Sequence, residues 1–222
     1  MEVGYMVTKK TVEEVFSKVS KKYDLFLNLV TFGRIDLWQR EMLGMLSCEG
    51  NRLDVGTGTG EVLLKSQNRG LKVGMDLSKD MLRLAKEKCK VCRFLVGDAE
   101  NMPFKEGSFN SLTLSLVFRH LLDRRSFLRE VRRVLKEGGE LALLDINRFS
   151  LTPFLVFLMK FPLKPFGLLL FGAEKWSFFI HSLENALSLE EVKRELREEG
   201  FEVVEVQKRL LGFVYLLLAR RC

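Results

Sequence analysis

Residues 52–61 read RLDVGTGTGE, a short apolar run that contains one acid and continues into three alternating glycines. The apolar run predicts a buried strand, and the residues after the glycines, 61–68, predict a helix. Glycine accepts a positive φ and has no Cβ, so a ligand can lie directly against this backbone. In a doubly wound sheet, ligands bind where such a loop leads from a strand into a helix. The stretch therefore predicts an α/β fold that holds a nucleotide-like ligand.

The spacing of these glycines disfavours a dinucleotide. Dinucleotide-binding loops follow the pattern G-x-G-x-x-G, whereas Gly56, Gly58 and Gly60 alternate. Glu61 would also bring a negative charge close to the phosphates of such a ligand. An acid beside the loop is better suited to a ligand that carries a positive group, so a dehydrogenase is not expected.

Strand-like and helical segments alternate along most of the chain. Strands are expected at residues 72–76, 92–96, 111–117 and 140–146, and helices at residues 8–46, 78–88 (capped by Ser78) and 123–135 (ended by Gly138 and Gly139). Such alternation predicts right-handed crossovers and a parallel sheet that is covered on both faces.

The pattern changes at the end of the chain. A helix is expected at residues 189–199, stopped by Gly200, and strands at residues 201–209 and 213–220. The turn between these two strands is too short for a parallel crossover, so they must be antiparallel.

Length and composition limit the function classes. The 222 residues suit one large domain, and 47% hydrophobic with 29% charged residues is a globular balance. The net charge of +7 would suit nucleic acid, but the basic residues are interleaved with glutamates in helical segments and indicate a solvated surface. No basic-aromatic module is apparent, and LSLVF stands where an N/D-P-P-Y/F motif would follow the fourth strand. We therefore expect no nucleic-acid partner.

Four cysteines are present, and Cys89 and Cys92 have CxxC spacing. No second pair lies at zinc-ligand spacing, so no metal site is expected. A redox CxxC would begin a helix, whereas this one falls between a helix and a strand, so we expect no chemistry from it. With no secretory signal in MEVGYMVTKK, this cysteine usage predicts a reducing cytoplasm.

Residues 149–172, FSLTPFLVFLMKFPLKPFGLLLFG, form the most apolar segment. Three prolines and two lysines interrupt it, so it does not predict a membrane span, which needs about 20 continuous apolar residues. The segment suits a lid over the substrate, either as a surface patch partly inserted at the inner face of a membrane or as a channel for an isoprenoid or acyl tail. A helix pair in the core or in a homodimer interface is the alternative.

Polar residues follow consecutive predicted strands. Asp76 ends the second strand, residues 98–100 (Asp-Ala-Glu) follow the third, and Ser115 lies near the end of the fourth. An acid at the position of Asp76 suits ribose hydroxyls, and a polar pair after the third strand can meet a base edge. Each is an ordinary cap or loop residue by itself, but their recurrence at one edge of the sheet predicts a nucleoside site.

The segments LDVGTGTGE, GMDLSKDML, GDAENMPFKEGSFN and REVRRVLKEGG resemble the successive motifs of class I S-adenosylmethionine-dependent methyltransferases, over roughly residues 50 to 147. The resemblance implies S-adenosylmethionine as cofactor, with Asp54 and the glycine loop at its methionine part, Asp76 at the ribose, and Asp98 and Ala99 at the adenine. The cofactor-binding residues expected on this basis are Asp54, Gly56, Thr57, Gly58, Thr59, Gly60, Asp76, Leu77, Met81, Asp98, Ala99, Glu100 and Ser115.

Three further stretches resemble the ubiquinone/menaquinone biosynthesis C-methyltransferases: residues 23–39 (YDLFLNLVTFGRIDLWQ), 114–141 and 175–205. The resemblance implies that Arg119, acting with a bound water, and Tyr23 serve the substrate ring. His120 stands where that family has Asn, Trp176 and Phe178 replace its tyrosines, and its proline-rich sequence after the fifth strand is largely absent.

Arg119 and His120 each have an alternative interpretation. Arg119 is either a donor to a ring oxygen or half of a structural ion pair with Asp123 at helical spacing. His120 is either a base or a surface or helix-cap histidine, and His181 is expected to be structural.

The fold expected is a Rossmann-like, doubly wound sheet of the class I methyltransferases, mostly parallel with an antiparallel last strand, plus N-terminal helices and a helical apolar lid. We expect a single domain: an N-terminal cap (1–47), a cofactor-binding core (48–147), a lid (148–187), and a C-terminal helix and hairpin (188–222). The function expected is C-methylation of a lipid-tailed quinol. The alternative is N- or O-methylation of a phospholipid headgroup or another small molecule; a non-catalytic binding protein on this scaffold is disfavoured by the intact loop.

Overall fold

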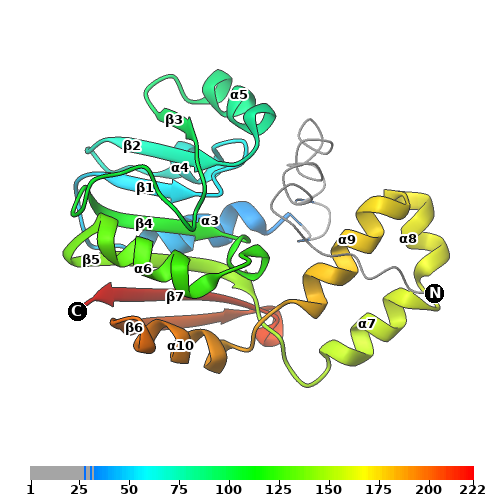
Figure 1. Ribbon diagram of the computed structural model, residues 1–222. Helices are drawn as coiled ribbons and strands as arrows, with labels where there is room; N and C mark the ends of the chain where they lie inside the picture. Colours follow the sequence, from blue (N-terminus) through cyan, green and yellow to red (C-terminus); the bar gives the residue numbers. More distant parts are fainter. Residues whose placement is uncertain (1–27, 29–30, 32) are drawn as a thin grey trace.

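The computed structural model describes residue 28, residue 31 and residues 33–222. Seven strands form one sheet in the order β3-β2-β1-β4-β5-β7-β6 (Figure 1). The strands are β1 Arg52–Val55, β2 Lys72–Asp76, β3 Arg93–Val96, β4 Phe109–Ser115, β5 Leu135–Ile146, β6 Phe201–Arg209 and β7 Val214–Arg221. The helices are α3 Ile35–Gly44, α4 Glu61–Lys65, α5 Lys79–Lys88, α6 Arg124–Val134, α7 Thr152–Lys160, α8 Lys164–Phe171, α9 Ala173–Glu184 and α10 Leu189–Glu198, with short turns η2 Phe118–His120 and η3 Leu210–Gly212.

The sheet has the expected mixed topology. Strands β1 to β5 pair in parallel, and β7 runs antiparallel to both of its neighbours, β5 and β6. The doubly wound fold and the antiparallel last strand are therefore confirmed. Because β6 and β7 are joined by the short turn η3, the predicted hairpin is also present.

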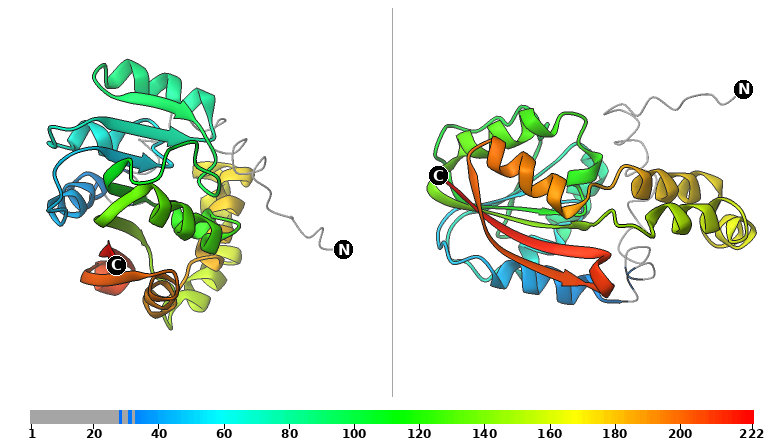
Figure 2. Two further views of the ribbon diagram at one scale, coloured as in Figure 1. Left: turned by 60° about the vertical axis from the view of Figure 1, so that its left-hand side comes forward. Right: turned by 90° about the horizontal axis from the view of Figure 1, so that it is seen from below.

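Alternation along the central strands separates two hydrophobic cores. In β5, Leu141 and Leu143 belong to a core with residues of α6 and α10, whereas Ala142 and Leu144 belong to a core with α3. Helices α6 and α10 thus cover one face of the sheet and α3 covers the other (Figure 2). Both faces are buried, which explains why β5 ends in the nearly continuous apolar run ELALLDI.

The glycine stop predicted for the helix at residues 123–135 is wrong. Helix α6 ends at Val134, and Leu135 already begins β5, where it pairs with Phe109 of β4. The register then jumps, so that Ser111 of β4 faces Glu140, and the intervening residues of β5 form an irregularity in which Gly138 has φ 67°. The glycines therefore accommodate a bulge within the strand. Helix α4 is also shorter than expected, because Ser66 already has extended backbone angles.

Helices α7, α8 and α9 form a separate projection between β5 and α10 (Figure 2). Trp176 of α9 holds the three together: its Nε1 donates to the carbonyl oxygen of Met159 at 3.2 Å, and its ring covers Gly167 so closely that an added Cβ would lie 2.2 Å from it. Proline occupies the first turn of both α7 and α8, where its missing N–H costs nothing. Among the helices that the structure describes, none is long and apolar enough to cross a membrane.

The projection leaves and re-enters the core through a narrow neck. The backbone N–H of Arg148 donates to the carbonyl oxygen of Leu187 at 2.8 Å, which brings the two ends of the excursion together. The Asn147 side chain accepts from the N–H of Leu189 and donates to the carbonyl oxygen of Gly212, each at 2.8 Å. These bonds fix the start of α10 beside the end of β5.

Cys89 and Cys92 form a disulfide, with their Cα atoms 5.5 Å apart. Both sulfurs are buried, and the pair packs against Leu63 and Phe94. The expectation of no chemistry from the CxxC pair is therefore wrong, because the two cysteines are joined covalently. The chain turns at the end of α5 and brings the two cysteines to a Cα–Cα distance at which a disulfide forms. The spacing in the sequence did not reveal this turn.

Candidate functional site

A cavity lies at the carboxyl ends of β1, β2 and β4, beside α3 and α4. Nearly all of the residues predicted for the cofactor line it: Asp54, Gly56, Thr57, Gly58, Thr59, Asp76, Leu77, Met81, Asp98, Ala99, Glu100 and Ser115, together with His120. Gly60 and Arg119 are not among the lining residues, and Tyr23 lies outside the described part of the chain. The parallel strands thus bring residues that are up to 66 positions apart in sequence, Asp54 to His120, to one edge of the sheet.

The glycine loop needs its glycines for two different reasons. Gly56 has φ 65°, and a Cβ there would lie 2.5 Å from Val117, so no side chain fits. Gly58 has φ 53°, but an added Cβ would meet no atom within 4 Å among the described residues. The loop therefore presents open backbone at Gly58, which can receive a ligand in direct contact.

Asp54 is the buried acid of the site. Its side chain accepts a hydrogen bond from Thr113 Oγ1 at 2.6 Å, while its Oδ2 has no hydrogen-bond partner among the described residues. Burial raises the pKa of Asp54 to about 6, although the hydroxyls of Thr113 and Thr57 oppose that rise. A buried carboxylate oxygen without a donor is costly, and a cationic ligand or an N–H donor would satisfy it.

Glu61, the acid that directly follows the glycine loop, is paired with two lysines. Its carboxylate lies 2.9 Å from the Lys65 Nζ and 2.7 Å from the Lys88 Nζ. Burial would raise the pKa of Glu61, but the hydrogen bonds from Lys88 and Lys65 outweigh it and lower the pKa. Of the two acids that flank the glycine loop, Asp54 is therefore the one available to a cationic ligand.

The acids after β2 and β3 shape the loops around the cavity. Asp76 accepts from the backbone N–H of Gly58 at 2.9 Å and from that of Ser78 at 2.8 Å, so it fixes the glycine loop to the start of α5. Asp98 accepts from the N–H of Glu100. Glu100 in turn accepts from the N–H groups of Leu122 and Asp123, each at 2.9 Å. The loop after β3 is thus tied to the one that precedes α6.

His120 lies in the wall of the cavity at the end of η2. The chain turns there because Leu116 adopts a left-handed conformation, φ 61°, which is uncommon for a leucine and occurs where surrounding structure holds it. His120 is half-buried and is the last residue of η2, so its position agrees with a residue at a helix end as well as with a base that faces the cavity. Burial, with a contribution from the Arg119 charge, lowers the pKa of His120 well below its ordinary value.

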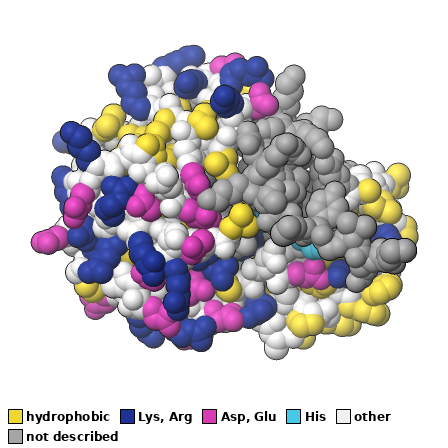
Figure 3. All heavy atoms as spheres, in the orientation of Figure 1, with side chains coloured by type: hydrophobic (Ala, Val, Ile, Leu, Met, Phe, Trp, Pro, Cys, Tyr) yellow, Lys and Arg dark blue, Asp and Glu magenta, His cyan; other side chains and the backbone are white. Residues whose placement is uncertain are grey.

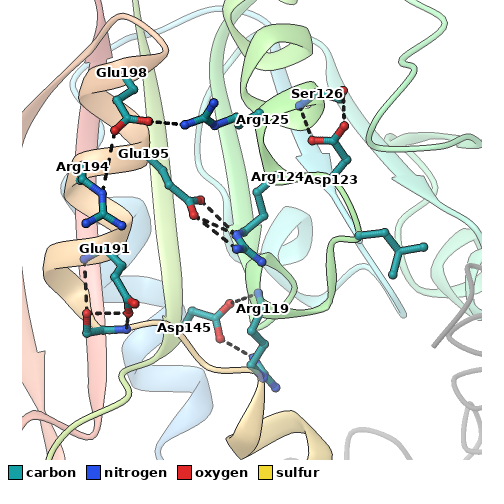
Figure 4. Close-up of polar contacts among 12 residues, drawn as sticks. Arg119, Asp123, Arg124, Arg125, Ser126, Asp145, Glu191, Arg194, Glu195 and Glu198 are labelled. Carbon is teal, nitrogen blue, oxygen red and sulfur yellow. Dashed lines mark hydrogen bonds and ion pairs between the residues drawn. The ribbon is translucent and has the colours of Figure 1, made fainter. Parts of the chain in front are cut away.

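Arg119 points away from Asp123 and pairs with Asp145 of β5 (Figure 4). Its Nε donates to Ser182 Oγ of α9 at 2.6 Å, and its backbone N–H donates to Asp145 at 3.2 Å. Asp123 instead caps α6 by accepting from the N–H of Ser126 at 3.0 Å. The expected pair of Arg119 with Asp123 is thus wrong in its partner. His181 is exposed, and its Nδ1 lies 3.1 Å from Glu184.

Sequence reasoning missed the contribution of α3 and α4. Gln39 is buried, lines the cavity, and donates from Nε2 to Ser115 Oγ at 3.3 Å. Asp36 and Lys65 also line the cavity. Gln39 stood within the quoted stretch 23–39, but its contact with Ser115, 76 residues away, is not visible in a local pattern.

Comparison with known proteins identifies the family. Residues 5–219 match the ubiE/COQ5 methyltransferase family. The chain belongs to this family. A demethylmenaquinone methyltransferase of Thermotoga maritima is 36% identical over 207 residues, which cover 88% of this chain and 90% of that protein. Another protein of that name, from Staphylococcus aureus, is 31% identical over 212 residues, covering 90% and 88% of the two chains.

A ubiquinone/menaquinone biosynthesis C-methyltransferase of Rickettsia bellii is 30% identical over 221 residues, 91% of this chain and 89% of that one. A solved S-adenosylmethionine-dependent methyltransferase of Thermotoga maritima has a TM-score of 0.71 at 21% identity and covers 95% of this chain and 99% of that one. The [4+2]-cyclase SpnF has the same TM-score at 17% identity, with 96% of each chain covered. These two likenesses show the fold alone.

This member of the ubiE/COQ5 methyltransferase family is an S-adenosylmethionine-dependent methyltransferase. The residues of the cavity fit that cofactor on structural grounds. The Asp54 Oδ2, which has no hydrogen-bond partner within residues 33–222, suits the positively charged methionine part, and the open backbone at Gly58 admits a ligand at van der Waals distance.

Proposed function

We propose that this enzyme methylates a ring carbon of a lipid-tailed quinol of the demethylmenaquinol type. The observation that carries the proposal is the extent of the match: the family covers residues 5–219, including the lid as well as the cofactor core. Relatives named demethylmenaquinone methyltransferase support this acceptor. N- or O-methylation of a phospholipid headgroup or another small molecule is the alternative.

Methyl transfer to carbon is an in-line displacement. S-adenosylmethionine, when bound, supplies a methyl group on a sulfonium; the bond from the ring carbon to the methyl forms as the bond from sulfur to the methyl breaks. The ring carbon then loses its proton to a base. Much of the rate enhancement comes from holding the reacting atoms in line and excluding water, which is the task of the glycine loop and the lid.

His120 is our candidate for the base. It lines the same cavity as Asp54 and Ser115, and its imidazole is neutral at neutral pH, so a ring nitrogen is free of a proton there. Burial lowers the pKa and so makes the imidazole a weak base, which passes the proton on readily. The cofactor residues predicted from the sequence keep their proposed roles: Asp54 at the methionine part, Asp76 at the ribose, and Asp98 at the adenine.

Arg119 and Tyr23 are proposed to serve the ring oxygen of the acceptor. The Arg119 guanidinium is held by Asp145 and by Ser182 of the lid, so a donor from it would be fixed in position before substrate arrives. The contact with Ser182 also joins Arg119 to α9. An acceptor that binds under the lid and moves α9 would therefore move the Arg119 side chain.

The lid carries an apolar surface that suits a lipid tail. Phe154, Phe157, Phe161, Phe166 and Leu169 are each more than half exposed. Hydrophobic side chains gather on α7 and α8 at the edge of the molecule (Figure 3). An exposed cluster of this kind is a site for a membrane or a partner. We propose peripheral contact with the inner face of a membrane; a homodimer through this surface is the alternative.

The test uses S-adenosylmethionine with a labelled methyl group and a chemically reduced total lipid extract. Label in a quinone fraction supports the proposal, whereas label in phospholipid supports headgroup methylation and contradicts it. A Phe157→Glu/Phe166→Glu variant should lose vesicle binding and methylation of the tailed quinol, yet retain methylation of a tail-free quinol analogue. Leu71→Glu, an exposed leucine at the opposite end of the sheet, is the matched control. Sedimentation of the same variants distinguishes vesicle contact from a dimer.

A further inference from the structure

The charges around the cavity are strongly unequal. Among its described lining residues, Lys65 carries the only lysine or arginine side chain. The carboxylates that line the same cavity are Asp36, Asp54, Glu61, Asp76, Asp98 and Glu100. A cavity this acidic attracts the sulfonium and the ammonium of the cofactor but repels its carboxylate.

Lys65 is the cation that the described cavity wall offers to that carboxylate. Its side chain is only 7% exposed, and the residue lies on α4, which begins directly after the glycine loop. It shares the cavity wall with Asp54, our candidate for the methionine part, and with Gln39 of α3. An amino-acid group has opposite charges on neighbouring atoms, so an acid and a base in one wall match it.

Both acids that pair with Lys65 also pair with a second cation. Lys65 Nζ lies 2.9 Å from Glu61 and 3.2 Å from Asp36. Glu61 also pairs with Lys88 at 2.7 Å, and Asp36 also pairs with Arg40 at 2.9 Å. Each acid thus keeps a cation when Lys65 turns to a ligand, so neither is left as an uncompensated charge.

We propose that Lys65 leaves Asp36 and binds the carboxylate of the methionine moiety of S-adenosylmethionine. Lys65 would thereby determine specificity for a cofactor that carries this carboxylate. The proposal concerns cofactor binding and does not depend on the methyl acceptor. Asp36 belongs to α3 and Glu61 to α4, so the exchange also loosens one tie between these helices when the cofactor binds.

The experiment measures dissociation constants by titration calorimetry for S-adenosylmethionine and for decarboxylated S-adenosylmethionine, which lacks only the carboxylate. In the Lys65→Met variant, affinity for the complete cofactor should fall about ten- to a hundredfold, as expected for a hydrogen bond between charged groups. Affinity for the decarboxylated compound should be almost unchanged.

The matched control is Lys88→Met, because Lys88 pairs with the same Glu61 but does not line the cavity. This variant should retain the wild-type ratio of the two constants. An equal loss for both ligands in Lys65→Met would show that Lys65 only braces α3 against α4, and no loss at all would overturn the proposal as well. Lys65→Arg, which keeps the charge, should preserve the ratio of the two dissociation constants. If Lys65→Met does not fold, Lys65→Gln replaces it: the proposal expects a ratio near one in Lys65→Gln and the wild-type ratio in Lys65→Arg.

Discussion

Arg119, in the turn after β4, and Asp145, near the end of β5, form an ion pair whose side chains are only 9% and 2% exposed. Asp145 also accepts from the backbone N–H of Ile146 at 2.7 Å, and Arg119 reaches the lid through Ser182. The pair therefore fixes the turn that carries His120 against the strand that leads into the lid.

Removing one partner of this pair should destabilise the protein strongly. Asp145→Ala leaves the buried Arg119 charge uncompensated, at an expected cost of about 3–5 kcal/mol in the free energy of unfolding. The double variant Arg119→Met/Asp145→Leu should lose much less free energy of unfolding than the two single variants lose together. Urea unfolding measures these free energies. Arg125→Ala, which breaks an exposed pair with Glu198, is the control and should cost under about 1 kcal/mol. Additive single effects would contradict the coupling.

Asp54 should make cofactor affinity depend on pH. Its pKa is raised to about 6, so below that pH the carboxyl is mostly protonated and loses its attraction for a cation. We expect the affinity for S-adenosylmethionine to fall as pH decreases from 7 to 5, and Asp54→Asn to bind weakly at both values. Calorimetry at each pH checks this, with Asp80→Asn on the surface of α5 as the control. An affinity that is flat with pH would refute the role of Asp54.

The same residue should have the opposite effect on stability without cofactor. The folded-state pKa lies above the ordinary 3.8, so the folded protein binds more protons and loses stability as pH rises from about 4 to about 6. The full loss is on the order of 3 kcal/mol. Asp54→Asn should therefore unfold at a higher temperature than the wild type at pH 7, while their difference disappears near pH 4.

His120 should respond to pH in the other direction. Its pKa is lowered, so the unfolded chain takes up a proton near the ordinary value of 6.5 while the folded protein does not. Stability should thus fall as pH decreases below about 6.5, by at most about 1.4 kcal/mol per pH unit. Thermal unfolding of His120→Asn should lack this slope, and His181→Asn, an exposed histidine, should keep it. If His120 is the base, His120→Asn also lowers kcat and leaves the dissociation constant of the cofactor unchanged.

The disulfide should contribute measurably to stability. Closing the four-residue loop from Cys89 to Cys92 is worth about 2 kcal/mol on the chain-entropy estimate. Reduction should therefore lower Tm by roughly 4–8 °C for a chain of this length. Alkylation and mass measurement confirm the redox state. The Cys48→Ser/Cys222→Ser variant, which removes the two free cysteines, should show the same sensitivity to reductant; an unchanged Tm after confirmed reduction would refute the prediction.

Much of the sheet could be predicted because its signals are local. Buried parallel strands appear as short apolar runs, and polar residues such as Asp76 mark the edge at which they end. The predicted helix cap Ser78 is likewise local, since it accepts from the backbone N–H of Met81, three residues away. The expected and observed strands therefore differ mainly at their ends.

The errors concern contacts between distant residues. Gly138 and Gly139 resemble a helix stop until the pairing of Leu135 with Phe109 shows that the strand has already begun. Arg119 has an acid four positions away, but its partner, Asp145, is 26 positions away on another strand. Lys65 and Gln39 have no distinctive pattern, because only the packing of α3 and α4 brings them to the cavity.

The neck at Arg148 and Leu187 has a consequence for how this enzyme can change over evolutionary time. Because the two ends of the excursion are bonded to each other and Asn147 anchors α10, the path between them does not set the register of β5 or β7. Residues 149–186 can therefore diverge, or be transplanted from a relative, while the cofactor half of the enzyme is inherited intact, provided that the Ser182 contact with Arg119 and the core shared by Ile180 and Leu183 with β5 and β7 are kept. A lineage could in this way acquire a new methyl acceptor by rewriting one contiguous stretch of its gene.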